Sequence, residues 1–132
     1  MTWWDINWQR RIRIDINNLD QSSAFTNQPV LVTLDSSLIN YSHFKTNGAD
    51  VRFVAADDLT SLDYEIERWD ATNADTSQIW VRIPSITASS EKSYFYMYYN
   101  NPSAVDAQNK TGVWTSYWGV WHLNENSSGT AL

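Results

Sequence analysis

The middle of the chain alternates between apolar and polar residues in a way that few folds accommodate. The alternation covers residues 51–55, 64–67 and 79–83, and a period of two residues is typical of half-buried β-strands. Polar, turn-forming clusters such as residues 70–75 and 85–90 separate these stretches. Short strands and turns that return every ten to fifteen or so residues are typical of antiparallel all-β domains.

The same reasoning extends to the rest of the chain. We expect a short helix within residues 36–44, where alternation is absent and apolar residues recur at helical spacing. The expected strands are 8–16, 29–35, 50–55, 63–69, 78–83 and 93–99, with one or two more within 112–123. The predicted fold class is all-β, a two-sheet antiparallel β-sandwich that is jelly-roll-like and carries one short helix.

The apolar phase of each strand predicts the core between the two sheets. The residues expected to be buried and to contact one another are Ile12, Ile14, Val30, Val32, Phe53, Ile66, Val81 and Met97.

Composition indicates an extracellular or cell-surface setting. The chain has no cysteine, only three lysines and a formal net charge of −6, so disulfides and thiol catalysis are excluded. Nucleic acid is not an expected partner, because phosphate binding needs a basic stripe and the six arginines are spread among acids. No apolar run approaches the roughly 20 residues that span a bilayer, so no membrane insertion is expected. The first residues lack the order of a signal peptide, and we expect any export signal to have been removed.

Six motifs carry a resemblance to a known family. They are WQRRI (8–12), PVLV (29–32), NGADVRF (47–53), YEIERW (64–69), IWVRIP (79–84) and YMYYNN (96–101). Their order and spacing resemble the bacterial domain of unknown function DUF2341 over about Trp3 to Pro102. The resemblance implies a place in large secreted or surface proteins, some of them fused to proton-channel-type membrane segments, and it implies no catalytic residues. Asn100 stands where the family usually has glycine, but asparagine also tolerates a left-handed backbone.

The end of the chain differs in character. Residues 119–125 and the polar residues after them resemble the opening strand and turn of a laminin-G-like (concanavalin A-type) lectin domain, of which only the beginning is present. We therefore divide the chain into a DUF2341-like sandwich at residues 1–107 and a linker with an incomplete lectin-like domain at residues 108–132. The alternative is a last strand that completes the first sandwich. The apolar residues of 114–123 are expected to pack on the first domain or on another copy of it, as a strand added to an open edge.

Eight tryptophans are the main candidates for ligand contacts, since aromatic rings stack on the faces of sugars. Trp8, Trp69 and Trp80 lie within strand motifs, where packing in the fold is the better interpretation. The candidate ligand-binding residues are Trp3, Trp4, Trp114 and Trp118. Docking of a neighbouring domain is the favoured use of Trp3 and Trp4.

Acidic and histidine residues give weaker signals. Glu65 and Glu67 lie on one strand face at roughly 7 Å, near the spacing of glycosidase carboxylate pairs; a solvated face paired with Arg52, Arg68 or Arg82 is the better interpretation. Asp57 and Asp58 are weak calcium candidates, although they lack the order of an EF-hand loop. No transition-metal spacing surrounds the two histidines.

The function expected from these observations is that of a non-catalytic extracellular module of a bacterial surface or secreted protein. It would act in adhesion or present the neighbouring lectin-like domain, with weak glycan binding of its own and no cofactor other than the calcium considered above. Two alternatives remain: a structural subunit of a surface fibre or pilus, with strands pairing between copies, and an accessory domain of a carbohydrate-active enzyme.

Overall fold

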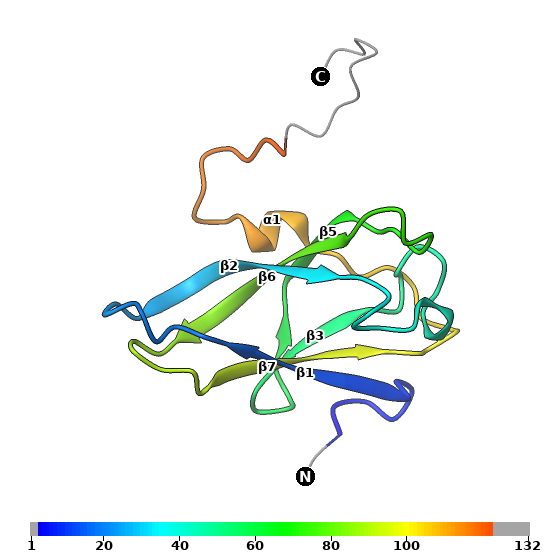
Figure 1. Cartoon of the computed structure of the whole chain (residues 1–132), viewed down its shortest axis with the longest axis horizontal. Helices are drawn as coiled ribbons and strands as arrows, with labels where there is room; N and C mark the ends of the chain where they lie inside the picture. Colours follow the sequence, from blue (N-terminus) through cyan, green and yellow to red (C-terminus); the bar gives the residue numbers. More distant parts are fainter. Residues whose placement is uncertain (1–2, 123–132) are drawn as a thin grey trace.

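Residues 3–122, which the computed structural model describes, form two antiparallel β-sheets packed face to face (Figure 1). The four-stranded sheet has the order β1-β7-β3-β4 and the three-stranded sheet the order β2-β6-β5. The strands are, in chain order, β1 (Arg10–Ile16), β2 (Phe25–Leu34), β3 (Arg52–Ala55), β4 (Ser61–Leu62), β5 (Tyr64–Arg68), β6 (Ser77–Ile86) and β7 (Ser93–Tyr99). The all-β sandwich expected from the alternation is therefore confirmed.

The strand pairing is nested. The first strand pairs with the last and the second with the second to last, so β1 lies beside β7 and β2 beside β6. β3 then adds to β7 in one sheet, and β5 adds to β6 in the other. This nesting is the jelly-roll-like arrangement, in which the chain passes repeatedly between the two sheets.

The main core fills the space between the sheets, and the predicted register is correct. All eight residues expected there belong to one apolar cluster. Val32, Phe53, Val81 and Met97 are buried; Ile12, Ile14, Val30 and Ile66 are partly buried and pack against them. The partly buried members on β1 and β2 border an open side of the sandwich, where a groove of about 470 Å³ lies between these two strands.

Of the two short helical elements, one was expected and one was not. Residues 36–44 contain a helical turn, the 3₁₀ helix η1 (Tyr41–His43), as expected, but the α-helix α1 (Lys110–Val113) lies where strands were expected. The prediction of one or two strands within 112–123 is therefore wrong for the described residues up to 122. The side chain of Asn109 accepts a hydrogen bond from the Gly112 N–H at 3.1 Å, which closes a helical turn instead. That turn places Val113 fully out of solvent, so apolar burial is achieved without strand pairing.

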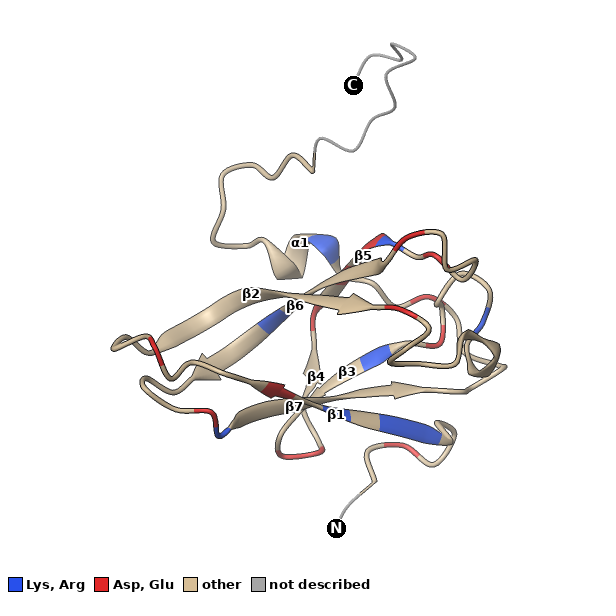
Figure 2. Ribbon diagram, viewed as in Figure 1, with Lys and Arg blue, Asp and Glu red and all other residues tan. Residues whose placement is uncertain are grey.

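Charged residues of both signs are interspersed along the strands and loops (Figure 2). Among the described residues, none of the helices is long and apolar enough to cross a membrane.

Candidate functional site

Asp50 joins three loops at one end of the sandwich. Its side chain is buried, and Oδ1 accepts a hydrogen bond from the backbone N–H of Lys45 at 2.9 Å. Oδ2 accepts from the backbone N–H groups of Asn100 and Asn101 at 3.0 and 3.3 Å. The Trp8 indole Nε1 donates to the Asp50 carbonyl at 2.6 Å. We call these five residues the Asp50 junction.

Arg52 and Tyr64 hold the chain around this junction. The Arg52 guanidinium donates to the carbonyls of Ala49, Val51 and Val105 at 2.9, 2.7 and 2.5 Å. The Tyr64 hydroxyl donates to the Val51 carbonyl at 2.8 Å. Backbone carbonyls that no strand partner reaches are thereby satisfied.

Asn100 has φ +67°, so an asparagine holds this turn in the left-handed region, as expected. Because the motif residues Trp8, Asp50, Arg52, Tyr64 and Asn100 contact one another or one another's backbone, their role is to hold loops and strands together.

The four tryptophans selected as ligand-binding candidates do not form one site. Trp3 and Trp4 lie on the outer face of the four-stranded sheet, with ring centroids 5.2 and 5.6 Å from that of Tyr98. Trp114 and Trp118 follow α1 on the side of the three-stranded sheet. Figure 1 shows the first described residues and α1 on opposite sides of the sandwich.

The N-terminal tryptophans belong to a packed cluster. Besides Trp3 and Trp4, this N-terminal aromatic cluster contains Trp8, Arg11, Asp58, Tyr96 and Tyr98. Arg11 pairs with Asp58 and lies 4.3 Å from the ring centroid of Tyr96. The Tyr98 hydroxyl donates to Asp58 Oδ1 at 2.5 Å. Burial raises the pKa of Tyr98 above its ordinary value, and the bond to Asp58 adds to the effect.

The two calcium candidates point to different partners. Asp58 is buried in the N-terminal aromatic cluster, whereas Asp57 closes an exposed turn. Hydrogen bonds from the Thr60 hydroxyl, and from the backbone N–H groups of Thr60 and Leu59, hold the pKa of Asp57 below its usual range. Within residues 3–122, no group of three or more His, Cys, Asp or Glu side chains is placed to hold a metal ion.

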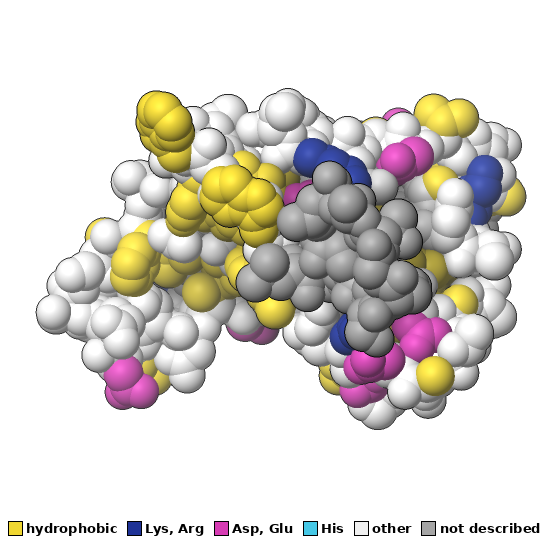
Figure 3. All heavy atoms as spheres, turned by 90° about the horizontal axis from the view of Figure 1, so that it is seen from above, with side chains coloured by type: hydrophobic (Ala, Val, Ile, Leu, Met, Phe, Trp, Pro, Cys, Tyr) yellow, Lys and Arg dark blue, Asp and Glu magenta, His cyan; other side chains and the backbone are white. Residues whose placement is uncertain are grey.

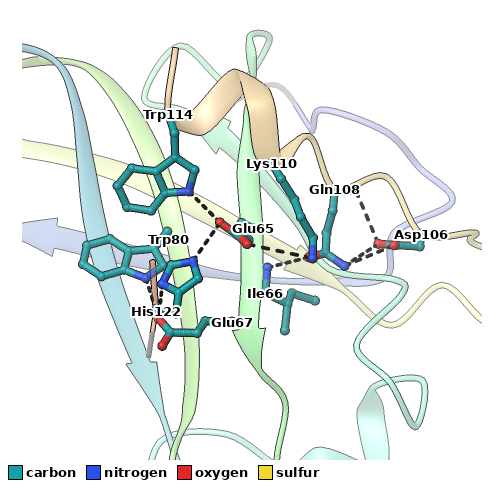
Figure 4. A network of polar contacts seen from close by, with 9 residues as sticks. All are labelled: Glu65, Ile66, Glu67, Trp80, Asp106, Gln108, Lys110, Trp114 and His122. Atoms are coloured by element: carbon teal, nitrogen blue, oxygen red, sulfur yellow. Dashed lines mark hydrogen bonds and ion pairs between the residues drawn. The ribbon is translucent and has the colours of Figure 1, made fainter. Parts of the chain in front are cut away.

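The second group of aromatic residues lies on the outer face of the three-stranded sheet, around two carboxylates (Figure 4). Glu65 Oε2 accepts a hydrogen bond from Trp114 Nε1 at 2.6 Å, and Glu67 Oε2 accepts one from Trp80 Nε1 at 2.7 Å. The His122 imidazole lies between them, with Nε2 3.3 Å from Glu65 Oε2 and Nδ1 3.4 Å from Glu67 Oε2. We call these five residues the aromatic–carboxylate face.

Strand geometry places both glutamates on this face, as their spacing on β5 predicted. Trp80 of β6 lies directly opposite Glu65 in the register, and its ring centroid is 5.1 Å from that of Trp114 in an edge-on contact. α1 fixes Trp114 in this position, because the Arg82 guanidinium donates to the Gly112 carbonyl at 3.0 Å.

The expectation that these acids pair with arginine is wrong. Glu65 is 7 % exposed; Lys110 Nζ lies 3.9 Å from its Oε1, and the His122 imidazole lies 3.3 Å from its Oε2. Arg52 binds backbone carbonyls beside the Asp50 junction, Arg68 pairs with Asp75, and Arg82 donates to the Gly112 carbonyl. The sequence could not show this, because Trp114 and His122 reach Glu65 from 49 and 57 residues away.

Beside this face the surface is open and aromatic. A depression of about 360 Å³ is lined by Glu65, Lys110, Thr111, Trp114, Tyr117, Gly119, Val120 and His122. Trp118 is fully exposed, Trp121 is 71 % exposed and Tyr117 is 48 % exposed. Figure 3 looks onto this side and shows hydrophobic side chains gathered in one area. The surface has the stacking rings and acceptors that sugars contact, but Glu65 and Glu67 already bind indoles of the same chain.

Fold and site together define a β-sandwich module that carries residues 110–122 on one outer face. Comparison with known sequences identifies the family: residues 47–129 match "Domain of unknown function (DUF2341)", and the chain belongs to this family.

Residues 47–129 extend past the predicted domain boundary at 107/108. That boundary, and the lectin-like start at 119–125, which continues outside the described residues, stay predictions.

An archaeal protein is also similar. The protein named "Uncharacterized protein MJ1472" of Methanocaldococcus jannaschii is 28 % identical over 110 residues, which cover 76 % of this chain and 20 % of that protein. The chain thus spans about a fifth of that relative's length. No solved structure gives a significant match to the chain.

Proposed function

We propose that this chain is a non-catalytic β-sandwich module of an exported, surface-associated protein, and that its aromatic–carboxylate face anchors the segment leading to the next domain. The single observation that carries the proposal is the 2.6 Å hydrogen bond from Trp114 Nε1 to the buried Glu65 carboxylate. A hydrogen bond to a charged, desolvated acceptor is among the stronger ones in proteins, at about 1.5–3 kcal/mol. The best-formed polar site outside the Asp50 junction therefore holds part of the chain itself.

The residues after the anchor support a docking role. Trp118 and Trp121 present large apolar surfaces directly after a fixed point, and such surfaces usually mark interaction sites. A domain that follows, lectin-like in our sequence interpretation, would rest on these rings and be held at a defined orientation. The chain is similar to only one fifth of a much longer relative, which supports the proposal that it is one module of a multidomain protein.

Trp114→Phe tests the anchor, because it removes the indole donor and keeps an aromatic ring. We expect residues 110–122 to become sensitive to limited proteolysis while the β-sheet circular dichroism stays unchanged. Trp118→Phe is the matched control, since the Trp118 side chain is fully exposed, and it should leave the cleavage pattern as in the wild type. Equal cleavage in wild type and Trp114→Phe would refute the anchor.

Weak glycan binding is a second candidate, favoured by the exposed rings of Tyr117 and Trp118 beside the depression described above. Stacking does not titrate, so binding should be insensitive to pH. Glycan-array screening with Trp118→Ala is the direct test, and Trp4→Ala on the opposite face is the control. Glycan hydrolysis that disappears in Glu65→Gln would overturn the non-catalytic proposal.

A further inference from the structure

The two sheets have four edge strands, and three of them are protected within the described residues. β4 has only two residues. β5 is covered: the Ile66 N–H donates to Gln108 Oε1 at 2.6 Å, and the Tyr64 carbonyl accepts from the Asn109 N–H at 3.0 Å. Short edges and covered edges do not pair with another chain.

β2 is protected by its sequence. Asn27 has φ +50°, which breaks the regular strand conformation, and Pro29 has no N–H to donate. The Pro29 carbonyl already accepts from Gln28 Nε2 at 3.1 Å. β1, with seven residues and no proline, glycine or irregular residue, is the remaining edge.

The hydrogen-bond phase of β1 follows from its start. The Gln9 N–H donates to the Asn100 carbonyl, and the register pairs Arg10 with Tyr99. Bonding residues alternate along an antiparallel strand, so odd-numbered residues of β1 bond to β7. The N–H and C=O groups of Ile12, Ile14 and Ile16 therefore point to the free edge, while their side chains border the apolar groove between β1 and β2.

The charges on β1 match those of a second β1 in antiparallel orientation. Pairing about a two-fold axis at Ile14 places Arg13 opposite Asp15 of the second copy, and Asp15 opposite its Arg13. Ile12 then lies opposite Ile16, and the residues with free N–H and C=O groups face one another. Alignments centred on Ile12, Arg13 or Asp15 also satisfy the hydrogen-bond phase, but each of them places like charges opposite each other, which is unfavourable. Figure 2 shows both basic and acidic segments on β1.

We propose that β1 is the pairing strand of a symmetric homodimer, in which a second copy of this chain extends the four-stranded sheet across a two-fold axis at Ile14. The same surface is used by both copies, so the assembly closes at two. The partly buried isoleucines of both copies come to lie in one continuous layer, and the edge hydrogen bonds are satisfied. This inference concerns the opposite sheet from the aromatic–carboxylate face and does not depend on the function proposed above.

Charge reversal tests the register. Arg13→Asp and Asp15→Arg each replace two opposite-charge pairs by two like-charge pairs, and the side chains are 52 % and 60 % exposed, so folding should persist. Sedimentation equilibrium of the full chain should show a dimer for the wild type and a dissociation constant raised about tenfold or more for each variant. Asp75→Arg is the matched control, because Asp75 is equally exposed and pairs with Arg68 away from β1; it should not change the dissociation constant.

Complementation separates pairing from any local effect of the substitutions. Mixed in equal amounts, the two single variants should form a heterodimer, since the aspartate introduced at position 13 faces the arginine introduced at position 15. The double variant Arg13→Asp with Asp15→Arg should recover the wild-type constant. If the wild type stays monomeric up to about 1 mM, the proposal is wrong, whether the outer edge of β1 is empty or is filled by another part of the chain. A dimer that ignores the reversals would also overturn the proposal.

Discussion

Removing the acceptor at the centre of the Asp50 junction should have a large effect on stability. In Asp50→Ala the backbone N–H groups of Lys45 and Asn100 lose bonds of 2.9 and 3.0 Å to a buried carboxylate. Hydrogen bonds to charged groups contribute about 1.5–3 kcal/mol each, so we expect a loss of about 3–6 kcal/mol. The longer contact from Asn101, at 3.3 Å, adds little. Because domains of this size are stable by only about 5–15 kcal/mol, this variant lies near the limit of folding.

Asp50→Asn should still fold, so the loss of unfolding free energy can be measured in this variant. One amide oxygen still accepts, while the amide nitrogen faces a donor, so the expected loss is about half as large, roughly 2–3 kcal/mol. Urea denaturation followed by fluorescence gives the free energy of unfolding, and hydrogen exchange should show faster exchange at Asn100. Asp75→Asn, at an exposed ion pair, is the control and should cost less than about 1 kcal/mol. A loss below about 1 kcal/mol in Asp50→Asn would refute the reasoning.

Three further predictions concern the core, a turn and acid stability. Phe53→Ala should lower the free energy of unfolding by about 3–5 kcal/mol, because Phe53 is 1 % exposed in the main core; a loss below about 1 kcal/mol in chemical denaturation would place it at the periphery. Gly48→Ala should cost at least about 1–2 kcal/mol, since Gly48 has φ +70° and an added Cβ would lie 2.8 Å from the ring of Trp69; an unchanged denaturation midpoint would contradict this. The pKa of Asp57 is lowered in the fold, chiefly by the Thr60 hydroxyl, so its stabilisation is present above its ordinary pKa of 3.8 and is lost as the pH falls through the lower folded value. Asp57→Asn should therefore flatten the fall of the melting temperature below about pH 4, and a slope equal to that of the wild type would exclude this role.

Periodicity was sufficient to predict the sheets, because side-chain alternation and burial are local properties of a strand. β7 has the bounds expected from its sequence, and all eight predicted core residues belong to the main cluster. Local signals failed after residue 109, where one helical turn buries Val113 and a strand was expected. Whether a helical turn or a strand forms there depends on the hydrogen bond from the Gly112 N–H to Asn109 and on the contact of Gly112 with Arg82 of the three-stranded sheet. Apolar alternation does not contain this information.

The sequence predicted only part of the candidate site, namely its two glutamates and not their partners. The spacing of Glu65 and Glu67 on one strand correctly placed them on a common face, but their partners arrive from the far end of the chain. The tryptophans were grouped by their positions near the two termini, and the fold separates them onto opposite sheets. No pattern within a strand could have shown that Trp3 packs on Tyr98 while Trp114 packs on Trp80.

The chain enters the sandwich on one outer face and leaves it on the other, and this has a mechanical consequence. If such modules stand in series in a stretched surface protein, tension acts across the two layers and not along the strands. The first contacts to bear load would be those of Trp3 with Tyr98 on one side and of His122 with Glu65 on the other. Rupture of these contacts would lengthen the chain while the sheets stay intact, so each module would act as an extensible link.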